Sequence, residues 1–343
     1  MTNDGVNEVQ DYTSCQYGSA HEAVQEPTDH EAHNESPYFN FLLGKESGLG
    51  GVIIRIGLRP NEGYSEASLV IPRRDGTVVF HYERSPLTRD EVPVGARKWE
   101  SGPMTFEAVD PTRRWRLSYA SDNARLVTDP YLFGQKPGEA WRASEPLRCE
   151  FDVDWQAEFP IHVLSPNGHE LPGDMDGEYG KDHYEQFGQV SGTLRLGDEE
   201  WKLDAVPAVR DHSWGPRIWE KHPSSEWVSA YLDDGRRVVA FATSKDGSDD
   251  AHGVIWTPGS TQPIQIELYE LETDYAGGPA APKKVAWKFE GGGESITVEG
   301  KVTGFMPLRV GKNSIRLGQT VLDLVGDTPG RAKTDLGRPL TDA

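Results

Sequence analysis

A short segment of the sequence, residues 209–219 (Val-Arg-Asp-His-Ser-Trp-Gly-Pro-Arg-Ile-Trp), concentrates side chains that can do chemistry. It contains the carboxylate of Asp211, the imidazole of His212 and the hydroxyl of Ser213, together with two arginines and two tryptophans. Aspartate and histidine are general acid–base groups, and an arginine can anchor a carboxylate or an enolate oxygen. The competing interpretation is a structural corner, because isolated Asp-His pairs are often structural ion pairs.

Strand geometry separates the reactive groups of this segment. On an extended backbone, Asp211 and Ser213 would share one face, and His212 and Trp214 the other. Asp211 and His212 would then not form a dyad, and each would need a partner from another strand. This argues against a Ser-His-Asp arrangement, and the chain contains no Gly-x-Ser-x-Gly elbow. Serine hydrolysis is therefore not expected.

The segment just ahead carries a second acidic candidate, Glu185. If it forms a strand, Tyr184 and Gln186 share one face, and His183, Glu185 and Phe187 share the other. A glutamate beside a phenylalanine and directed into an apolar barrel would have a raised pKa, which suits a general acid or base near neutral pH. The alternative is an exposed edge strand with a solvated Glu185.

Glu35 is a similar case near the start of the first predicted strand. Its neighbours Asn34 and Ser36 can hold a carboxylate by hydrogen bonds, or Glu35 can simply begin the strand. The residues alone leave both interpretations open.

Charge and composition exclude several classes of partner and location. The 343-residue chain has a net charge of −20 and no run of Lys and Arg, so binding to nucleic acid or to an anionic membrane surface is not expected. No stretch approaches the roughly 18 apolar residues of a membrane span. The N-terminus lacks the pattern of a signal peptide, and the two cysteines, Cys15 and Cys149, do not suggest a disulfide framework. These features predict a cytoplasmic protein.

No metal or cofactor is expected from the motifs. The ten histidines show neither a His-x-His nor a His-Glu-x-x-His spacing, and phosphate-binding glycine loops are absent. Residues 174–178 (Asp-Met-Asp-Gly-Glu) are acidic, but their glycine is misplaced for an EF-hand. Acid–base groups in an aromatic setting remain, and they fit proton transfer on an apolar small molecule: hydration, dehydration, isomerisation or cyclisation.

The pattern of apolar residues predicts an all-β fold. Residues 52–59 alternate in hydrophobicity, and the turn sequence Arg-Asp-Gly-Thr at 74–77 separates two further strand candidates. Short strands separated by turns, without long helices between them, are typical of antiparallel sandwiches and barrels. Only residues 138–144 suggest a short helix. Further strands are predicted at 115–119, 149–159, 189–196, 201–206, 227–232, 237–243, 264–271, 285–289 and 295–302.

Four regions follow from this pattern. Residues 1–30 are acidic and polar and predict a flexible arm. Such an arm can also wrap a partner subunit, so a homodimer is one state that the sequence allows. Residues 31–208 and 209–325 have roughly the size of one barrel each, and residues 326–343 predict a loose C-terminal tail.

Two motifs resemble a known superfamily. The run Arg-Asp-His-Ser-Trp-Gly-Pro-Arg-Ile-Trp at 210–219, preceded by Tyr-Glu-Gln-x-Gly-x-Val-x-Gly at 184–192, resembles the AttH-like proteins and carotenoid 1,2-hydratases. Residues 34–41 (Asn-Glu-Ser-Pro-Tyr-Phe-Asn-Phe) are similar to the opening of the tandem-domain proteins of unknown function in that superfamily. Together these matches bracket most of residues 33 to about 325.

The resemblance implies two consecutive lipocalin-like β-barrels with a pocket at or near their junction. It also implies activity without redox cofactors on hydrophobic substrates, such as hydration of a carotenoid end or, in fungal relatives, pericyclic ring closure. On this resemblance the expected catalytic residues are Asp211, His212, Glu185 and Glu35. The expected substrate-binding residues are Trp214, Arg217, Trp219, Tyr184, Gln186, Tyr38 and Asn40.

The leading hypothesis is therefore a cofactor-independent hydratase, lyase or isomerase that acts on a terpenoid- or steroid-like molecule. A non-catalytic lipocalin-like carrier of such a molecule is the alternative, since fold alone does not determine function. A third interpretation makes the motif a structural lock between domains, with Arg210 or Arg217 paired to Asp211.

Overall fold

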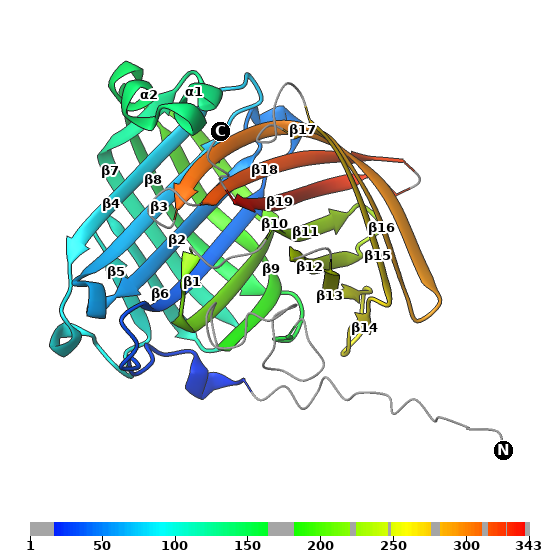
Figure 1. Cartoon of the computed structure of the whole chain (residues 1–343), viewed down its shortest axis with the longest axis horizontal. Helices are drawn as coiled ribbons and strands as arrows, with labels where there is room; N and C mark the ends of the chain where they lie inside the picture. Colours follow the sequence, from blue (N-terminus) through cyan, green and yellow to red (C-terminus); the bar gives the residue numbers. More distant parts are fainter. Residues whose placement is uncertain are drawn as a thin grey trace.

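The computed structural model describes residues 17–163, 182–219, 224–245, 248–275, 282–310, 315–326 and 328–339. Within these residues the chain forms two antiparallel sheets, one of ten strands and one of nine (Figure 1). The ten-stranded sheet closes on itself through an additional pairing of β4 with β7, and the nine-stranded sheet curves into a half-barrel beside it. The prediction of an all-β protein built as two lipocalin-like units is confirmed.

The first sheet has the strand order β4-β3-β2-β1-β10-β9-β8-β7-β6-β5. Neighbours in the sequence are mostly neighbours in the sheet, but the pairing of β1 with β10 joins the two ends of this unit. The strands are β1 (His33–Leu42), β2 (Gly51–Arg59), β3 (Tyr64–Pro72), β4 (Val78–Pro86), β5 (Lys98–Ser101), β6 (Met104–Asp110), β7 (Arg114–Val127), β8 (Glu145–Ala157), β9 (Asp182–Leu196) and β10 (Glu199–Pro216).

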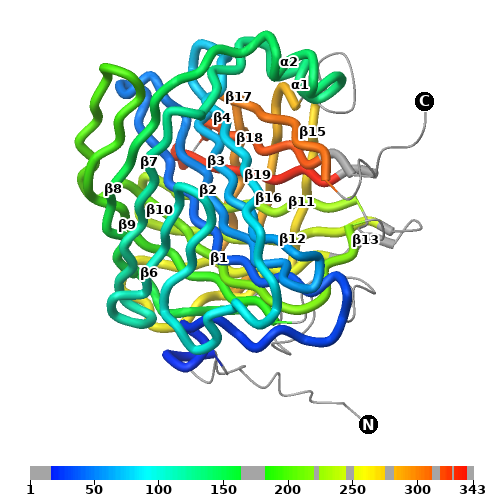
Figure 2. The backbone as a smooth tube through the Cα atoms, turned by 90° about the vertical axis from the view of Figure 1, so that its left-hand side faces the viewer, coloured from blue at the N-terminus to red at the C-terminus, as the bar shows by residue number. Residues whose placement is uncertain are grey.

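The second sheet has the order β14-β13-β12-β11-β19-β18-β17-β16-β15, so β11 pairs with the last strand of the chain. Figure 2 shows β17, β18 and β19 lying against the upper part of the first barrel. The strands are β11 (Ser224–Leu232), β12 (Arg237–Lys245), β13 (Ser248–Trp256), β14 (Ile264–Gln265), β15 (Leu268–Tyr275), β16 (Pro282–Gly291), β17 (Glu294–Val310), β18 (Ile315–Val325) and β19 (Gly330–Pro339).

Local sequence explains the hairpins that connect these strands. In the turn between β3 and β4, Gly76 has a φ of 91°, a conformation that suits glycine. The Asp75 carboxylate accepts a hydrogen bond from the Thr77 backbone N–H at 2.9 Å and so closes the turn. Gly235 plays the same part between β11 and β12, with a φ of 92°. These turns lie where the sequence predicted them.

The strands that face the second sheet are buried on both sides. In β2, Val52, Ile54 and Ile56 belong to the core inside the closed barrel. Ile53, on the opposite face, packs in a different apolar cluster with residues of the second sheet such as Trp227. The sequence predicted a half-buried strand here. Burial on both faces arises because the half-barrel covers the outside of the first barrel.

Two short helices, α1 (Pro130–Gln135) and α2 (Pro137–Ala143), join β7 to β8 at the upper end in Figure 1. The sequence predicted α2 but not α1. The side chain of Asp129 caps α1 by accepting a hydrogen bond from the Leu132 backbone N–H at 2.9 Å. Among the described residues, no helix has the length and apolar character needed to cross a membrane.

Two predictions about the organisation of the chain need correction. β10 runs to Pro216 within the first sheet, so the segment predicted to open the second unit at residue 209 belongs to the first. β1 pairs with this strand as far as Pro216, where it ends. The predicted loose tail is wrong for residues 330–339, which form β19.

The described part of the N-terminal arm is also ordered against the barrel, contrary to the prediction. Val24 is 2% exposed and exchanges backbone hydrogen bonds with Gly95 and Ala96. Glu22 is fully buried. Apolar content is low in this segment, so composition gave no sign that one carboxylate would fix it in place.

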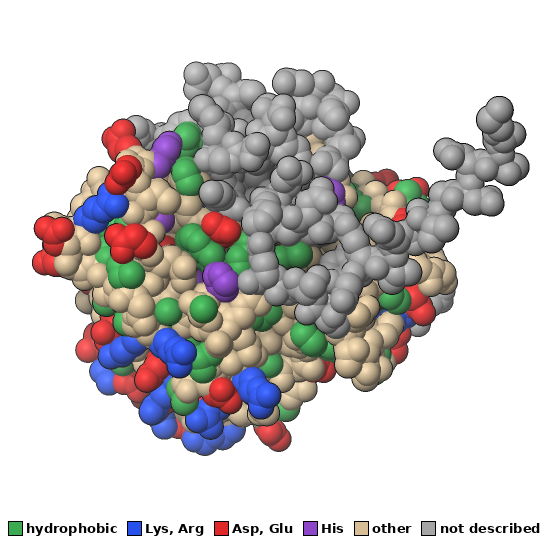
Figure 3. Space-filling view, turned by 90° about the horizontal axis from the view of Figure 1, so that it is seen from below, with side chains coloured by type: hydrophobic (Ala, Val, Ile, Leu, Met, Phe, Trp, Pro, Cys, Tyr) green, Lys and Arg blue, Asp and Glu red, His purple; other side chains and the backbone are tan. Residues whose placement is uncertain are grey.

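Figure 3 shows the molecule from below. On the described part of this face, Lys and Arg side chains are interspersed with Asp and Glu along one side. Neighbouring charges of opposite sign neutralise one another at short range. This visible part of the surface therefore presents no continuous basic area.

Candidate functional site

A cavity of about 1100 Å³ lies between the two sheets. Its size is slightly above the range of about 300–1,000 Å³ that is usual for pockets that hold small organic molecules. Both units contribute to its wall, and α1 and α2 contribute Phe133 and Trp141. The aromatic side chains of the wall are Tyr38, Tyr64, Phe80, Tyr82, Phe133, Trp141, Trp219, Trp227 and Phe241.

Strand register brings one line of functional side chains to this cavity from the first sheet. Asp211 of β10 lies directly opposite Tyr38 of β1 and directly opposite Glu185 of β9. Tyr38 in turn lies opposite Arg55 of β2. Because paired residues share a face, this line points as a whole toward the second sheet. Glu185 lies at its buried end, next to the cavity wall.

A matching line crosses the second sheet. Trp227 of β11 pairs with Phe241 of β12 on one side and with Asp335 of β19 on the other. Asp335 pairs with Gln319 of β18. All four side chains line the cavity. The site is therefore made of two facing rows, one from each sheet.

Asp211 is the acidic group of the first row that reaches the cavity. Its side chain is 18% exposed, and the ring of His183 approaches it at 4.0 Å. No described side chain donates a hydrogen bond to it. Burial raises the pKa of Asp211 to about 6, against the opposing effect of cations that include Arg217 and Lys333. The carboxyl group can therefore gain and lose a proton near neutral pH.

Glu185 is fully buried beside Asp211. One of its oxygens accepts a hydrogen bond from the Trp227 indole at 2.6 Å, and the other has no hydrogen-bond partner among the described residues. Burial and the neighbouring charge of Asp211 raise the pKa of Glu185 well above its ordinary value. Burial therefore favours the neutral form of Glu185. The alternative of an exposed edge strand is wrong, because β9 is internal to the sheet.

The ring of His183 lies close to both carboxyl groups. Its Nε2 atom lies 3.5 Å from Glu185 Oε1 and 4.0 Å from Asp211 Oδ1, and the ring lines the cavity. Burial lowers the pKa of His183 to about 3, and the nearby charge of Arg217 acts in the same direction. The ring is therefore neutral near pH 7. The sequence placed His183 on the correct face, but gave it no role.

Lys333 and Asp335 form the acid–base pair of the second row. The ammonium group of Lys333 is bonded to the Asp335 carboxylate and lies over two rings, 4.4 Å from the centre of Trp227 and 4.9 Å from that of Tyr38. Burial lowers the pKa of Lys333 and raises that of Asp335. The second oxygen of Asp335 is buried without a hydrogen-bond partner among the described residues. The sequence missed this pair because it assigned the segment to a tail.

Two more of the predicted substrate-binding residues line the cavity, Arg217 and Trp219. Arg217 donates a hydrogen bond to the Ser213 hydroxyl at 2.8 Å. Its guanidinium carbon lies 5.7 Å from the Trp219 ring centre. Asn40 is buried behind the wall and donates to the Tyr38 hydroxyl at 3.4 Å.

The remaining predicted residues lie on the other face of the same strands, away from the cavity. His212 bonds through Nδ1 to the Tyr184 hydroxyl at 3.0 Å and through Nε2 to Glu35 at 2.9 Å. Glu35 also accepts a hydrogen bond from the Trp99 indole at 3.0 Å. Trp214 packs nearby, with its ring centre 4.9 Å from that of His212. The expected separation of Asp211 from His212 is confirmed.

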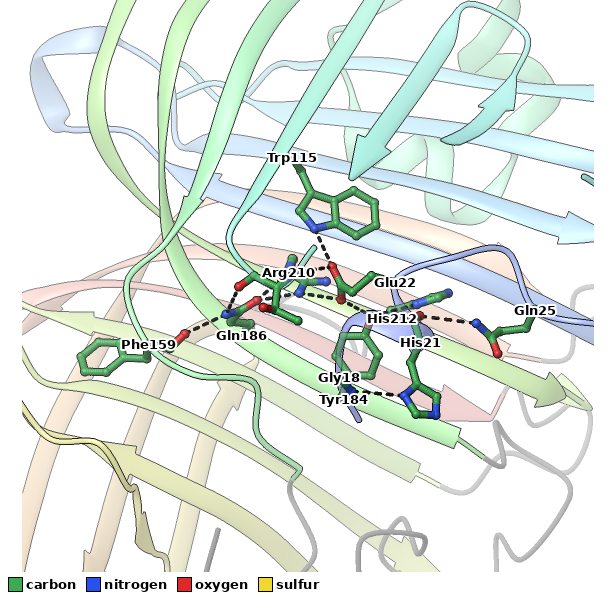
Figure 4. Close-up of polar contacts among 11 residues, drawn as sticks. Gly18, His21, Glu22, Gln25, Trp115, Phe159, Tyr184, Gln186, Arg210 and His212 are labelled. Atoms are coloured by element: carbon green, nitrogen blue, oxygen red, sulfur yellow. Dashed lines mark hydrogen bonds and ion pairs between the residues drawn. The ribbon is translucent and has the colours of Figure 1, made fainter. Parts of the chain in front are cut away.

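Figure 4 shows how this second network holds the N-terminal arm. Glu22 enters the end of the barrel and accepts hydrogen bonds from Arg210 at 2.8 Å, from Trp115 at 2.9 Å and from the Tyr184 hydroxyl. Burial alone would raise the pKa of Glu22, but Arg210, Tyr184 and His212 together outweigh it and lower the pKa below its ordinary value. Gln186 accepts a further bond from Arg210 at 2.6 Å.

The predicted site residues thus divide into two groups. Asp211, Arg217, Trp219 and Tyr38 line the cavity, and Glu185 and Asn40 lie directly behind its wall. His212, Glu35, Trp214, Tyr184 and Gln186 belong to the network around the arm. Arg210 pairs with Glu22, so the sequence-based idea of an Arg210–Asp211 lock does not describe this structure.

The acidic segment 174–178 lies outside the described residues. Among the residues that are described, no three His, Cys, Asp or Glu side chains are grouped closely enough to hold a metal ion.

A comparison with family models shows to which family this chain belongs. Residues 18–330 match the model described as a domain of unknown function, DUF7064. The protein belongs to the DUF7064 family. A comparison with curated proteins gave no match. Family membership therefore covers both units but assigns no activity.

Solved structures resemble this DUF7064 protein in fold. A candidate AttH from Nitrosomonas europaea is 16% identical, with a TM-score of 0.60 over 92% of this chain and 95% of that one. Kievitone hydratase from Nectria haematococca is 10% identical, with a TM-score of 0.56 over 89% and 88%. CghA bound to Sch210972 is 14% identical, with a TM-score of 0.53 over 91% and 90%. The resemblance to AttH-like proteins is confirmed at the level of the fold.

Proposed function

We propose that this protein is a cofactor-independent hydratase, lyase or isomerase, and that it acts on a hydrophobic molecule in the cavity between the two sheets. The observation that carries the proposal is the placement of Asp211. Its carboxyl group combines access to the cavity with a pKa of about 6. A group with these properties can donate a proton to a bound molecule near neutral pH.

The wall of the cavity supports an apolar substrate. Tyr38, Trp227 and Phe241 lie around the acid, and Phe80 and Trp141 line the part near the helices. Flat rings of this kind favour a terpenoid- or steroid-like skeleton, which would bury apolar surface against them. One structural neighbour is a hydratase, which supports hydration or dehydration as the reaction class.

Polar groups at the wall would fix the orientation of the substrate. Arg217 and the hydroxyl of Ser213 lie on the same face as Asp211. An oxygen of the substrate bound there would be held by a charge-assisted hydrogen bond. Proton transfer from Asp211 would then be directed to one carbon or oxygen of the bound molecule.

Ligand extraction and native mass spectrometry of the protein purified from its own host test this proposal. The extracted compound is incubated with the wild type, with Asp211→Asn and with Asp154→Asn, in which an exposed carboxylate on β8 is removed. We expect conversion by the wild type and by Asp154→Asn, and a loss of at least about 100-fold in Asp211→Asn. Retention without conversion by all three proteins would identify a carrier instead.

A further inference from the structure

The second sheet contributes a carboxylate to the cavity that the proposed function does not yet use. Asp335 lines the cavity from β19, in the row that faces Asp211. One of its oxygens is bonded to Lys333, and the other is buried without a hydrogen-bond partner among the described residues. An unpartnered carboxylate oxygen is costly to bury, so its persistence calls for an explanation.

Lys333 explains how this carboxylate is held. Its ammonium group is fully buried and lies over the rings of Trp227 and Tyr38, at 4.4 and 4.9 Å from their centres. Contact with two aromatic faces stabilises the cation where water cannot. The Lys333 ammonium therefore fixes one oxygen of Asp335 and leaves the other, in the wall of the cavity, without a hydrogen bond from a described residue.

The phenol of Tyr38 is influenced by both carboxyl groups, that of Asp211 and that of Asp335. Burial and the charges of Asp335 and Asp211 together raise the pKa of its phenol well above the ordinary value. Both carboxyl groups are therefore within electrostatic range of a single hydroxyl on the wall. A molecule that contacts the Tyr38 ring would have one carboxyl group from each sheet near it.

We infer that Asp335, positioned by Lys333, is the second acid–base residue of the site and works as a pair with Asp211. This inference rests on the proposed function and deepens it. In a dehydration, Asp211 gives its proton to the departing hydroxyl group, the C–O bond breaks, and water leaves. Asp335 removes a proton from the adjacent carbon, whose C–H electrons form the double bond. One proton then returns from Asp335 to Asp211 through water in the cavity.

The pairing requires both sheets, and specific contacts hold them together. Arg74 of the turn after β3 forms a two-pronged ion pair with Asp323 of β18, at 2.9 and 3.0 Å. Arg237 of β12 does the same with Glu158, which follows β8, at 3.1 Å for both bonds. Neither contact touches Asp211 or Asp335, so docking of the sheets does not depend on the pair.

A neutral aryl epoxide, 1,2-epoxy-3-phenoxypropane, tests the pair without knowledge of the substrate. The ionised Asp335 would attack a ring carbon, forming an ester C–O bond while the ring C–O bond breaks, and the released oxygen would take the proton of Asp211. Peptide mapping by mass spectrometry locates the ester. We expect labelling of Asp335 in the wild type and in Asp154→Asn, and at least tenfold slower labelling in Asp211→Asn.

This comparison leaves the Lys333–Asp335 pair intact, so misfolding of a charge-pair variant does not obscure the result. Two results would contradict the inference that Asp335 and Asp211 work as a pair. One is labelling of Asp335 at the wild-type rate in Asp211→Asn, and the other is no labelling of Asp335 in the wild type.

The labelling experiment and the conversion of the extracted compound together distinguish a failure of this inference from a failure of the proposed function. Full conversion of the extracted compound by Asp335→Asn, with Asp211 still required, would overturn the pair and leave the proposed function standing. Labelling that depends on Asp211, in a protein that converts no extracted compound, would support the pair and count against the proposed function.

Discussion

Asp211 lies directly opposite Tyr38 in the pairing of β10 with β1, and both side chains line the cavity between the sheets. The two residues are far apart in the sequence, and the pairing of β1 with β10 brings them together. Asp211 is followed at once by His212, whose ring faces the other way and bonds to Glu35 and Tyr184. One face of β10 therefore lines the cavity, and the opposite face belongs to the network around the N-terminal arm.

The first prediction concerns the stability of Asp211→Asn. Because the pKa of Asp211 rises from 3.8 to about 6 on folding, ionisation of this group opposes folding above pH 6. The difference is at most about 3 kcal/mol. Asp211→Asn should therefore unfold at a higher temperature than the wild type at pH 8, and at a similar temperature at pH 4. Thermal unfolding followed by circular dichroism measures this. A lower unfolding temperature at pH 8 would mean that the carboxylate holds the structure together.

The second prediction concerns the pH dependence of turnover. If Asp211 donates the proton, kcat/KM should fall as the pH rises through about 6, by tenfold for each further pH unit. His183, with a pKa of about 3, does not titrate in this range. Initial rates measured between pH 5 and 8 with the extracted compound would show this decrease in kcat/KM. A flat profile would remove Asp211 as the donor.

The third prediction is that Glu185 takes no part in the proton transfer. Burial raises the pKa of Glu185 and so favours its neutral form, which accepts a hydrogen bond from Trp227, and a glutamine can accept the same bond. Glu185→Gln should keep the pH profile of the wild type. Glu185→Ala should lose about 1–3 kcal/mol of stability in urea unfolding, since the buried indole N–H is left unsatisfied. A changed pH profile in Glu185→Gln would assign this residue a catalytic part.

Sequence reasoning succeeded where the information is local. Alternation along β9 and β10 placed Asp211 and Glu185 on one face and His212 and Tyr184 on the other, since side-chain direction follows from the extended backbone. Turns such as that at Gly76 carry their own signal. The register between strands is not local: β1 pairs with β10, and no property of either segment indicates which residues of the other lie opposite.

Other parts of the site could not be predicted from the sequence, because they lie in segments whose charged residues suggest exposure to solvent. In β19, Ala332 and Leu336 are buried and alternate with Lys333 and Asp335, but the two charged residues made the segment look like a tail. Glu22 was hidden in the same way, because its partners come from distant strands. A buried ion pair can be recognised only when the partners are known.

The fourth prediction concerns Glu22 and the arm. Glu22→Gln would leave Arg210 buried without a charged partner, which typically costs about 3–5 kcal/mol. The exposed Glu26 of the same arm provides the control, and Glu26→Gln should be neutral. Urea unfolding compares the two. Because Arg210 lowers the pKa of Glu22, the stabilisation is present above about pH 4.5 and is lost as the pH falls through the lowered value. Equal stability of both variants would contradict this role of the ion pair.

The most direct test of the site is the pKa of Asp211, measured by carboxyl carbon NMR of the full-length protein labelled in aspartate. We predict a pKa of about 6, raised further when the neutral terpenoid β-ionone fills the cavity, because an apolar ligand displaces water from the carboxylate. Asp211→Asn identifies the resonance. A pKa near 4 that does not respond to β-ionone would contradict a catalytic acid in an apolar cavity.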